Sequence, residues 1–182
     1  MIGSTHMFFV LLLLASQNLS FQPHPTIDVG DQVLSLRASM VKEATILKIS
    51  VYQIDMYVSK EIPASSSASQ ASTKAFLLTF LRNIKAEKLA SSWLQDLQLY
   101  CETNCETLLK QARPVANALP EMEKGSTVLY VVRPTSVEVL VNGKPFGTIS
   151  GAAASQTVSD AFLGPKAPKD VRKALVLEPR RE

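Results

Sequence analysis

The stretch from Gly125 to Gly164 constrains the fold of this chain more than any other part. Its central strand alternates apolar and polar side chains and leads into Asn142-Gly143, a dipeptide that favours a type I′ turn because both residues tolerate positive φ. Pro145 favours an edge position for the returning strand, since proline lacks the backbone donor that an inner strand needs. A helix must then fold back over these strands. The expected elements are strands over 127–132, 136–141 and 144–150 and a helix over 152–162.

The earlier part of the chain adds strands to such a sheet. Strand structure is expected to begin at Val33, and the short apolar run from Phe76 to Leu81 is typical of a strand buried on both faces. In residues 44–58 apolar and polar side chains alternate with period two, but halfway along the apolar side chains move from odd-numbered to even-numbered positions. Because such a change moves side chains to the other face of a sheet, we expect a β-bulge near Tyr52-Gln53.

A long amphipathic helix is expected over 86–113, ended by Pro114, since proline disfavours helical geometry in the residue before it. Trp93 lies in its apolar stripe, and we interpret this residue as the anchor of the helix on the sheet rather than as a surface for a ligand. A short final helix opens at Pro168. These elements together predict an α+β domain with a mainly antiparallel sheet.

Cys101 and Cys105 are the two cysteines of the chain, and they lie four residues apart in the expected helix. A disulfide is permitted in an exported protein, since Cα atoms so spaced are about 6 Å apart. The bond requires the helix to loosen near Thr103-Asn104, because side chains four apart run nearly parallel. Two buried thiols are therefore favoured over a disulfide. With no histidine nearby, the pair does not predict a metal site.

An apolar run from Met7 to Ala15 predicts export. It is about half the ~20 residues that span a bilayer, and it matches the ~7–15-residue core of a secretory signal. No Lys or Arg precedes it, and the alternative is a buried N-terminal element. Cleavage after Ser16 would deliver the chain to the periplasm or the medium, with membrane contact only during export. The expected organisation is a signal peptide over 1–16, an arm over 17–32, one domain over 33–178 and a polar tail over 179–182.

Composition and motifs exclude several classes of function. The net charge is +3, without a cluster of basic and aromatic residues, so nucleic-acid binding has no support. The two histidines, His6 and His24, both precede the expected domain, which excludes a catalytic triad built on a core histidine. The glycines of the 125–164 stretch occupy hairpin and strand-exit positions and do not form a phosphate-binding loop. The residues indicate no catalytic group, no metal and no cofactor.

Four segments taken together resemble the chalcone isomerase-like proteins, and most closely the exported bacterial subgroup. Their order and spacing match over residues 34–177. The resemblance implies an open-faced β-sandwich, in which helices cover a large antiparallel sheet and an apolar cleft lies between the layers. The segments are ASMVKEATILKISVYQIDMYV, FLRNIKAEKLASSWLQDL, MEKGSTVLYVVRPTSVEVLVNGKPFGTISG and AFLGPKAPKDVRKALV.

The resemblance also implies a set of ligand-binding positions. Lys42 corresponds to the arginine that binds substrate in the plant isomerases, with Arg37 as the alternative in a different register. Tyr52 corresponds to a hydroxyl-bearing strand residue of those enzymes. Asp96 corresponds to their asparagine and Ser155 to a late Ser/Thr.

Two of these positions depart from the plant enzymes. The tyrosine that orders a water there corresponds to Leu89, which cannot donate a hydrogen bond, and Lys42 offers a point charge instead of a planar fork. The leading hypothesis is therefore a non-catalytic exported domain whose cleft holds a fatty acid or another small apolar ligand. The alternatives are an intramolecular lyase acting on a flavonoid-like or enone substrate, and a structural or interaction domain with a filled core.

Overall fold

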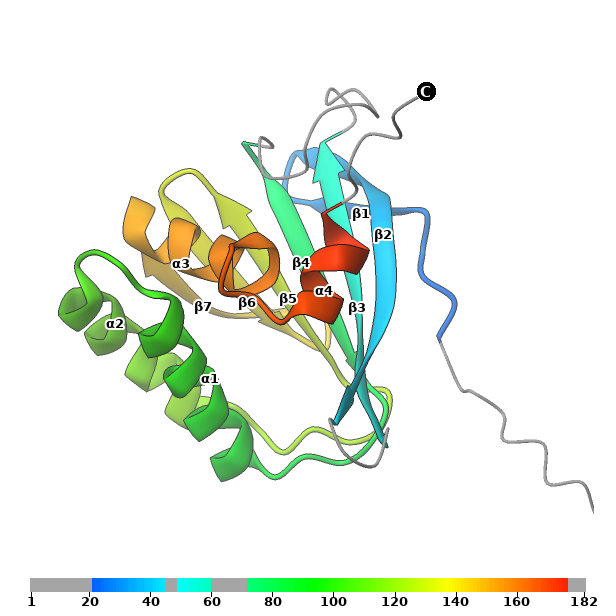
Figure 1. The fold of residues 1–182 in the computed structure, drawn as a ribbon, viewed down its shortest axis with the longest axis horizontal. Helices are drawn as coiled ribbons and strands as arrows, with labels where there is room; N and C mark the ends of the chain where they lie inside the picture. The colour runs from blue at the N-terminus through cyan, green and yellow to red at the C-terminus, as the bar shows by residue number, and fades with distance from the viewer. Residues whose placement is uncertain (1–20, 45–48, 60–71, 177–182) are drawn as a thin grey trace, which may run out of the picture.

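The computed structural model describes residues 21–44, 49–59 and 72–176, which form a seven-stranded antiparallel sheet and four helices (Figure 1). Each strand pairs with its neighbours in sequence, so the strand order is β1 to β7. The strands are β1 (Thr26–Val29), β2 (Gln32–Ala44), β3 (Ile49–Ser59), β4 (Lys74–Phe80), β5 (Thr127–Arg133), β6 (Ser136–Val141) and β7 (Lys144–Ser150). The helices are α1 (Ala86–Tyr100), α2 (Cys105–Ala118), α3 (Ala152–Leu163) and α4 (Lys169–Leu175).

The four helices pack on one face of the sheet, where the main hydrophobic core lies. Side chains that alternate along the strands, such as Ile54 and Phe76, meet helix residues such as Leu97 and Val158 in this core. A smaller cluster on the opposite face contains strand residues alone, with Tyr57 at its centre. In Figure 1 α4 lies nearest to β2 and β3, and α2 lies toward the β7 edge.

The predictions for the 125–164 stretch are confirmed. Asn142 and Gly143 have φ values of 49° and 75°, as a type I′ turn requires. β7, which carries Pro145, is an edge strand. α3 begins directly after Gly151 and ends before Gly164.

The sheet begins earlier than expected, within the segment assigned to an N-terminal arm over 17–32. β1 pairs with β2 through the two-residue turn Gly30-Asp31, in which Gly30 has a φ of 68°. Glycine adopts this conformation without steric cost, and a glycine-containing pair between two β-compatible runs is a hairpin signal. The expected start at Val33 is wrong. The first strand, β1, has only four residues, which are too few to show an alternation of apolar and polar side chains.

The change of phase in β3 does correspond to a bulge. Lys42 pairs with Tyr52 and Glu43 with Ser50, which leaves Val51 as the extra residue, adjacent to the expected position. From Tyr52 onward, even-numbered side chains of β3 face the helices. A second irregularity in β2 leaves Arg37 as the extra residue between Leu36 and Ala38.

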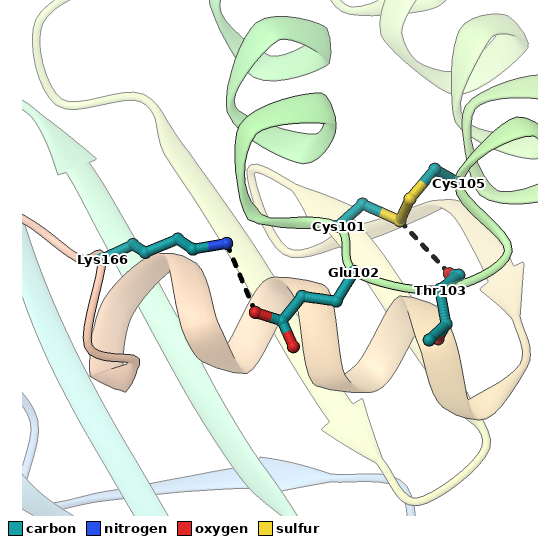
Figure 2. The surroundings of a disulfide bond; sticks show 5 residues. All are labelled: Cys101, Glu102, Thr103, Cys105 and Lys166. Carbon is teal, nitrogen blue, oxygen red and sulfur yellow. Dashed lines mark hydrogen bonds and ion pairs between the residues drawn. A yellow bond between two sulfur atoms is a disulfide. The ribbon is translucent and has the colours of Figure 1, made fainter.

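The helix expected over 86–113 is two helices. α1 ends at Tyr100, Asn104 takes the left-handed conformation with φ 54°, and α2 begins at the next residue. Cys101 and Cys105 form a disulfide across this break, with Cα atoms 5.6 Å apart (Figure 2). The expectation of two buried thiols is wrong, because the chain leaves the helical path between the cysteines and their side chains no longer run parallel.

The segment between α1 and α2 also contacts the segment that follows α3. Figure 2 shows Glu102 paired with Lys166, whose Nζ lies 3.3 Å from Oε1 of the glutamate. Both side chains are exposed, so we expect a contribution of only ~0–1 kcal/mol to stability.

Pro114 does not end α2, which continues to Ala118. Proline removes the backbone hydrogen bond to the carbonyl four residues earlier, here that of Lys110. Lys110 and Pro114 are both exposed, so water can take the place of the missing donor.

Candidate functional site

A cavity of about 330 Å³ lies between the helix-facing side of the sheet and α1, α3 and α4. Its volume is at the lower end of the ~300–1,000 Å³ that is typical of small-molecule sites. β2, β3, β4 and β5 provide its floor, and the helices provide its walls. Most of its lining is apolar, and the principal apolar contributors are Ile54, Leu78, Phe80, Leu97, Val158 and Phe162.

Aromatic rings hold the walls and floor of the cavity together. Tyr130 of β5 stacks on Trp93 of α1, with ring centroids 6.1 Å apart, and its ring lies 6.3 Å from that of Phe162. Phe162 in turn stacks on Phe76 at 4.3 Å. Such pairs add about 0.5–1.5 kcal/mol each beyond the area that they bury. The contacts link α1 and α3 to the sheet on both sides of the cavity.

Trp93 both anchors α1 on the sheet, as expected, and lines the cavity, which was not expected. The residue does pack α1 onto the sheet through Tyr130, as expected of an anchor. It is only half-buried, however, and it lines the cavity, so the expectation that it offers no surface to a ligand is wrong. A helix residue at the edge of a packed interface can serve both purposes.

Three of the five predicted ligand-binding residues line this cavity together. Lys42 of β2 and Tyr52 of β3 are partners across the strand ladder, and Asp96 approaches from α1. The bulge at Val51 keeps Tyr52 on the helix-facing side, in phase with Ile54. We call Lys42, Tyr52 and Asp96 the polar cluster of the cavity.

Lys42 of the polar cluster also contacts α4. Nζ of Lys42 lies 2.7 Å from Oδ2 of Asp170, the second residue of α4. The hydrogen bond from Lys42 is the main reason that the pKa of Asp170 lies below its usual value. Asp170 is therefore a carboxylate at neutral pH.

Burial changes the titration of the other two members of the cluster. It raises the pKa of Tyr52 to about 12, with further contributions from the negative charges of Asp96 and Asp170. Burial also raises the pKa of Asp96 above its usual value. Tyr52 is accordingly a neutral phenol at physiological pH, able both to donate and to accept a hydrogen bond.

The other two predicted residues, Arg37 and Ser155, are not part of the cavity lining. Arg37 is the extra residue of the β2 bulge. Ser155 lies seven residues before Phe162 on α3, ~10 Å along the helix. Its hydroxyl lies 3.4 Å from the carbonyl oxygen of Ser136 and lines a separate, smaller pocket near the start of α3.

Several lining residues escaped the sequence analysis. Val158, Ala161 and Phe162 lie three and four residues apart, a spacing that identifies one face of a helix and could have indicated this wall. Asp170, which contacts Lys42 without lining the cavity, gave no such signal, because Lys42 lies 128 residues earlier in the chain. Leu89 also lies in the cavity wall, as an apolar side chain.

Within the described part of the chain, no group of His, Cys, Asp and Glu side chains is arranged to hold a metal ion. The described helices also include none with the length and hydropathy of a membrane span. The run from Met7 to Ala15 lies outside the described residues.

Comparison with known proteins gives a family and a fold. The family model described as chalcone isomerase-like matches residues 17–177. The solved structure of a fatty-acid binding protein from Arabidopsis thaliana is similar, with a TM-score of 0.63 and 15% sequence identity over 79% of this chain and 86% of that chain. At this identity the likeness shows the fold, and it confirms the expected α+β architecture of a curled antiparallel sheet covered by helices. A search of curated protein sequences finds no match.

Proposed function

Because this chain belongs to the chalcone isomerase-like family, we propose that it is a non-catalytic binding protein that holds a fatty acid or another small apolar ligand between the sheet and α1, α3 and α4. The observation that carries this proposal is a cavity with an apolar body and a single polar cluster. An alkyl chain in this body would gain about 25 cal/mol for each Å² of apolar surface removed from water. The polar group of the ligand would meet Lys42 and Tyr52.

The similarity to the Arabidopsis fatty-acid binding protein supports a ligand of this class, although it extends to the fold alone. The cavity itself argues against the hypothesis of a domain with a filled core. A cavity of about 330 Å³, with exposed Ser92 at its rim, lies between the sheet and the helices. This volume falls within the ~300–1,000 Å³ that is typical of small-molecule sites, which supports a ligand.

Binding also suits the residues better than the alternative, an intramolecular lyase. Leu89 places an apolar side chain where the plant isomerases have a water-ordering tyrosine, and Asp170 already holds the ammonium group of Lys42. The raised pKa of Tyr52, about 12, opposes its use as a base at neutral pH. Conversion of a chalcone to a flavanone by the purified protein, lost in Lys42→Ala, would contradict the non-catalytic assignment.

We further propose that the protein is exported to the periplasm or the medium and belongs to the bacterial exported subgroup of the family. The basis is the apolar run from Met7 to Ala15, followed by small and polar residues. The disulfide between Cys101 and Cys105 supports the same proposal, since disulfides persist mainly in oxidising compartments.

The binding proposal is tested by obstructing the cavity from its rim. Ser92 lines the cavity yet is exposed on α1, so Ser92→Trp can place an indole across the opening without disturbing the core. We expect laurate to raise the melting temperature of the wild-type protein, because a ligand that binds the native state stabilises it by mass action. The affinity of Ser92→Trp for laurate, measured by calorimetry, should fall roughly tenfold or more, a loss of about 1.4 kcal/mol.

Ser91→Trp is the matched control. Ser91 is the preceding residue of the same helix, is also exposed and does not line the cavity. Its variant should bind laurate as the wild type does. The proposal fails if no lipid is found in native mass spectra of the purified protein and neither laurate nor palmitate shifts its melting temperature.

A further inference from the structure

The ammonium group of Lys42 is the natural partner for an anionic head group in the cavity. Among the described residues that line the cavity, Lys42 is the only one with a basic side chain. It is largely buried, with 19% of its side chain exposed. A carboxylate that entered the cavity would therefore have one cation with which to pair.

This cation already has an anionic partner within the protein. Oδ2 of Asp170 lies 2.7 Å from Nζ of Lys42, which is the short distance of a charge-assisted hydrogen bond. Asp170 does not itself line the cavity, but Pro168 and Val171 on either side of it do. Its own side chain is 55% exposed, so its carboxylate can turn toward water if another anion takes its place.

The surrounding charges increase the competition. Asp96 lies in the cavity wall, and both Asp96 and Asp170 act electrostatically on Tyr52, the partner of Lys42 across the strand ladder. An additional carboxylate near Lys42 would meet two like charges. The carboxylate of the ligand must either displace Asp170 from Lys42 or remain beside Asp170 and be repelled by it. An uncharged ligand avoids both the displacement and the repulsion.

We propose that Asp170 determines the specificity of the cavity: it competes with the carboxylate of a ligand for Lys42 and so selects against free fatty acids relative to uncharged ligands of the same chain length. This inference rests on the proposed binding function and names the residue that sets the preference. Asp170 acts through Lys42 and is a positioning residue.

The position of α4 does not depend on the ion pair alone. Val171 and Leu175 are buried at 3% and 0% exposure and anchor the helix on the core. Asparagine keeps the size of aspartate and an oxygen acceptor for the nearby backbone donor of Val171. Asp170→Asn should therefore fold and retain the cavity while losing the charge.

The test compares laurate with methyl laurate, its uncharged ester, in calorimetric titrations of the whole protein. Asp170→Asn should bind laurate on the order of fivefold more tightly than the wild type, the range expected when a partly exposed ion pair is removed. Its affinity for methyl laurate should not change. Lys42→Gln should abolish the effect, so that in the Lys42→Gln background Asp170→Asn no longer alters the affinity for laurate.

Glu106→Gln is the control for net charge, since it removes one exposed carboxylate from α2, away from the cavity. It should bind both probes as the wild type does. Equal affinities of wild type and Asp170→Asn for laurate, or an equal gain for laurate and the ester, would overturn the role of Asp170 while leaving the binding function intact. Failure of both probes to bind any variant or the wild type would overturn the binding function itself.

Discussion

At the scale of single residues, Asp96 shows how the cavity changes the chemistry of an ordinary side chain. It lines the cavity together with Tyr52, Tyr100 and Tyr130 but is exposed at the cavity edge, and partial burial of its carboxyl group raises its pKa. The negative charge of Asp96 in turn contributes to the raised pKa of each of these tyrosines. Because Asp96 is an exposed residue at the edge of the cavity, we expect its ionised form to cost little stability.

We predict that Asp96→Asn stabilises the protein at neutral pH. Because the pKa of Asp96 is raised in the folded state, its contribution to stability is greatest below the unfolded value of about 3.9 and is lost as the pH rises through the folded value. The advantage of the variant should shrink toward zero at acidic pH. Urea unfolding of both proteins across this pH range measures the difference.

Glu106→Gln serves again as the control, because it removes an exposed carboxylate outside the cavity. An Asp96→Asn variant that is less stable than the wild type at neutral pH would contradict the prediction and indicate that the carboxylate makes a favourable native contact.

Two of the predicted residues line the cavity from neighbouring strands, where the pairing of the strands sets the direction of their side chains. Tyr52 was placed beside a bulge from the change of phase in its strand, and Lys42 is its partner in the neighbouring strand. Ser155 could not be excluded in the same way. It shares a helical stripe with Val158 and Phe162, and only the position of α3 along the sheet decides which turns of that stripe face the cavity.

At the scale of elements, the interruption between α1 and α2 is the main departure from expectation. The apolar spacing continues through both helices, so periodicity alone indicates one helix. The interruption lets α1 follow the cavity, with Asp96 and Tyr100 on its inner face, while α2 packs on β7. The disulfide between Cys101 and Cys105 fixes this change of direction.

We predict that Cys101→Ser/Cys105→Ser lowers the free energy of unfolding by about 2 kcal/mol, the value expected for a bond that closes a loop of only five residues. Reductant should lower the stability of the wild type to that of the variant and leave the variant unchanged. Guanidinium unfolding with and without reductant measures both. A variant as stable as the oxidised wild type would show that the α1–α2 junction does not need the bond.

At the scale of the whole molecule, the sheet has two different faces. One face meets the four helices and carries the cavity, and the other carries a smaller apolar cluster with Gln53 and Asp55 buried in the same strand as Tyr57. The side chain of Gln53 donates a hydrogen bond to the carbonyl of Phe21, which ties the start of the described chain to this second face. The order β1 to β7 follows the order in the chain, and among the described elements only the pairing of β4 with β5 spans helices, α1 and α2.

Export is a prediction at this scale, because it concerns the fate of the entire chain. The full chain expressed in a bacterium with an oxidising periplasm should be recovered there, or in the medium, beginning at Gln17. Its two cysteines should resist alkylation. With residues 7–15 deleted, the protein should remain in the cytoplasm with two reactive thiols. Intact mass and N-terminal sequencing of each fraction distinguish these results, and an uncleaved cytoplasmic wild type would overturn the export proposal.

The sequence by itself determined the local structure and the family. Alternation along strands and the Asn142-Gly143 turn were sufficient for most of the sheet, because these features depend on neighbours in sequence. The resemblance, carried by the order of four weak motifs, supplied Lys42, Tyr52 and Asp96, which line the cavity. Only the tertiary structure decided that Lys42 is held by Asp170, that Trp93 faces a cavity and that Ser155 does not. Those outcomes depend on where helices settle on the sheet, and contacts between residues distant in the chain leave no periodic pattern in the sequence.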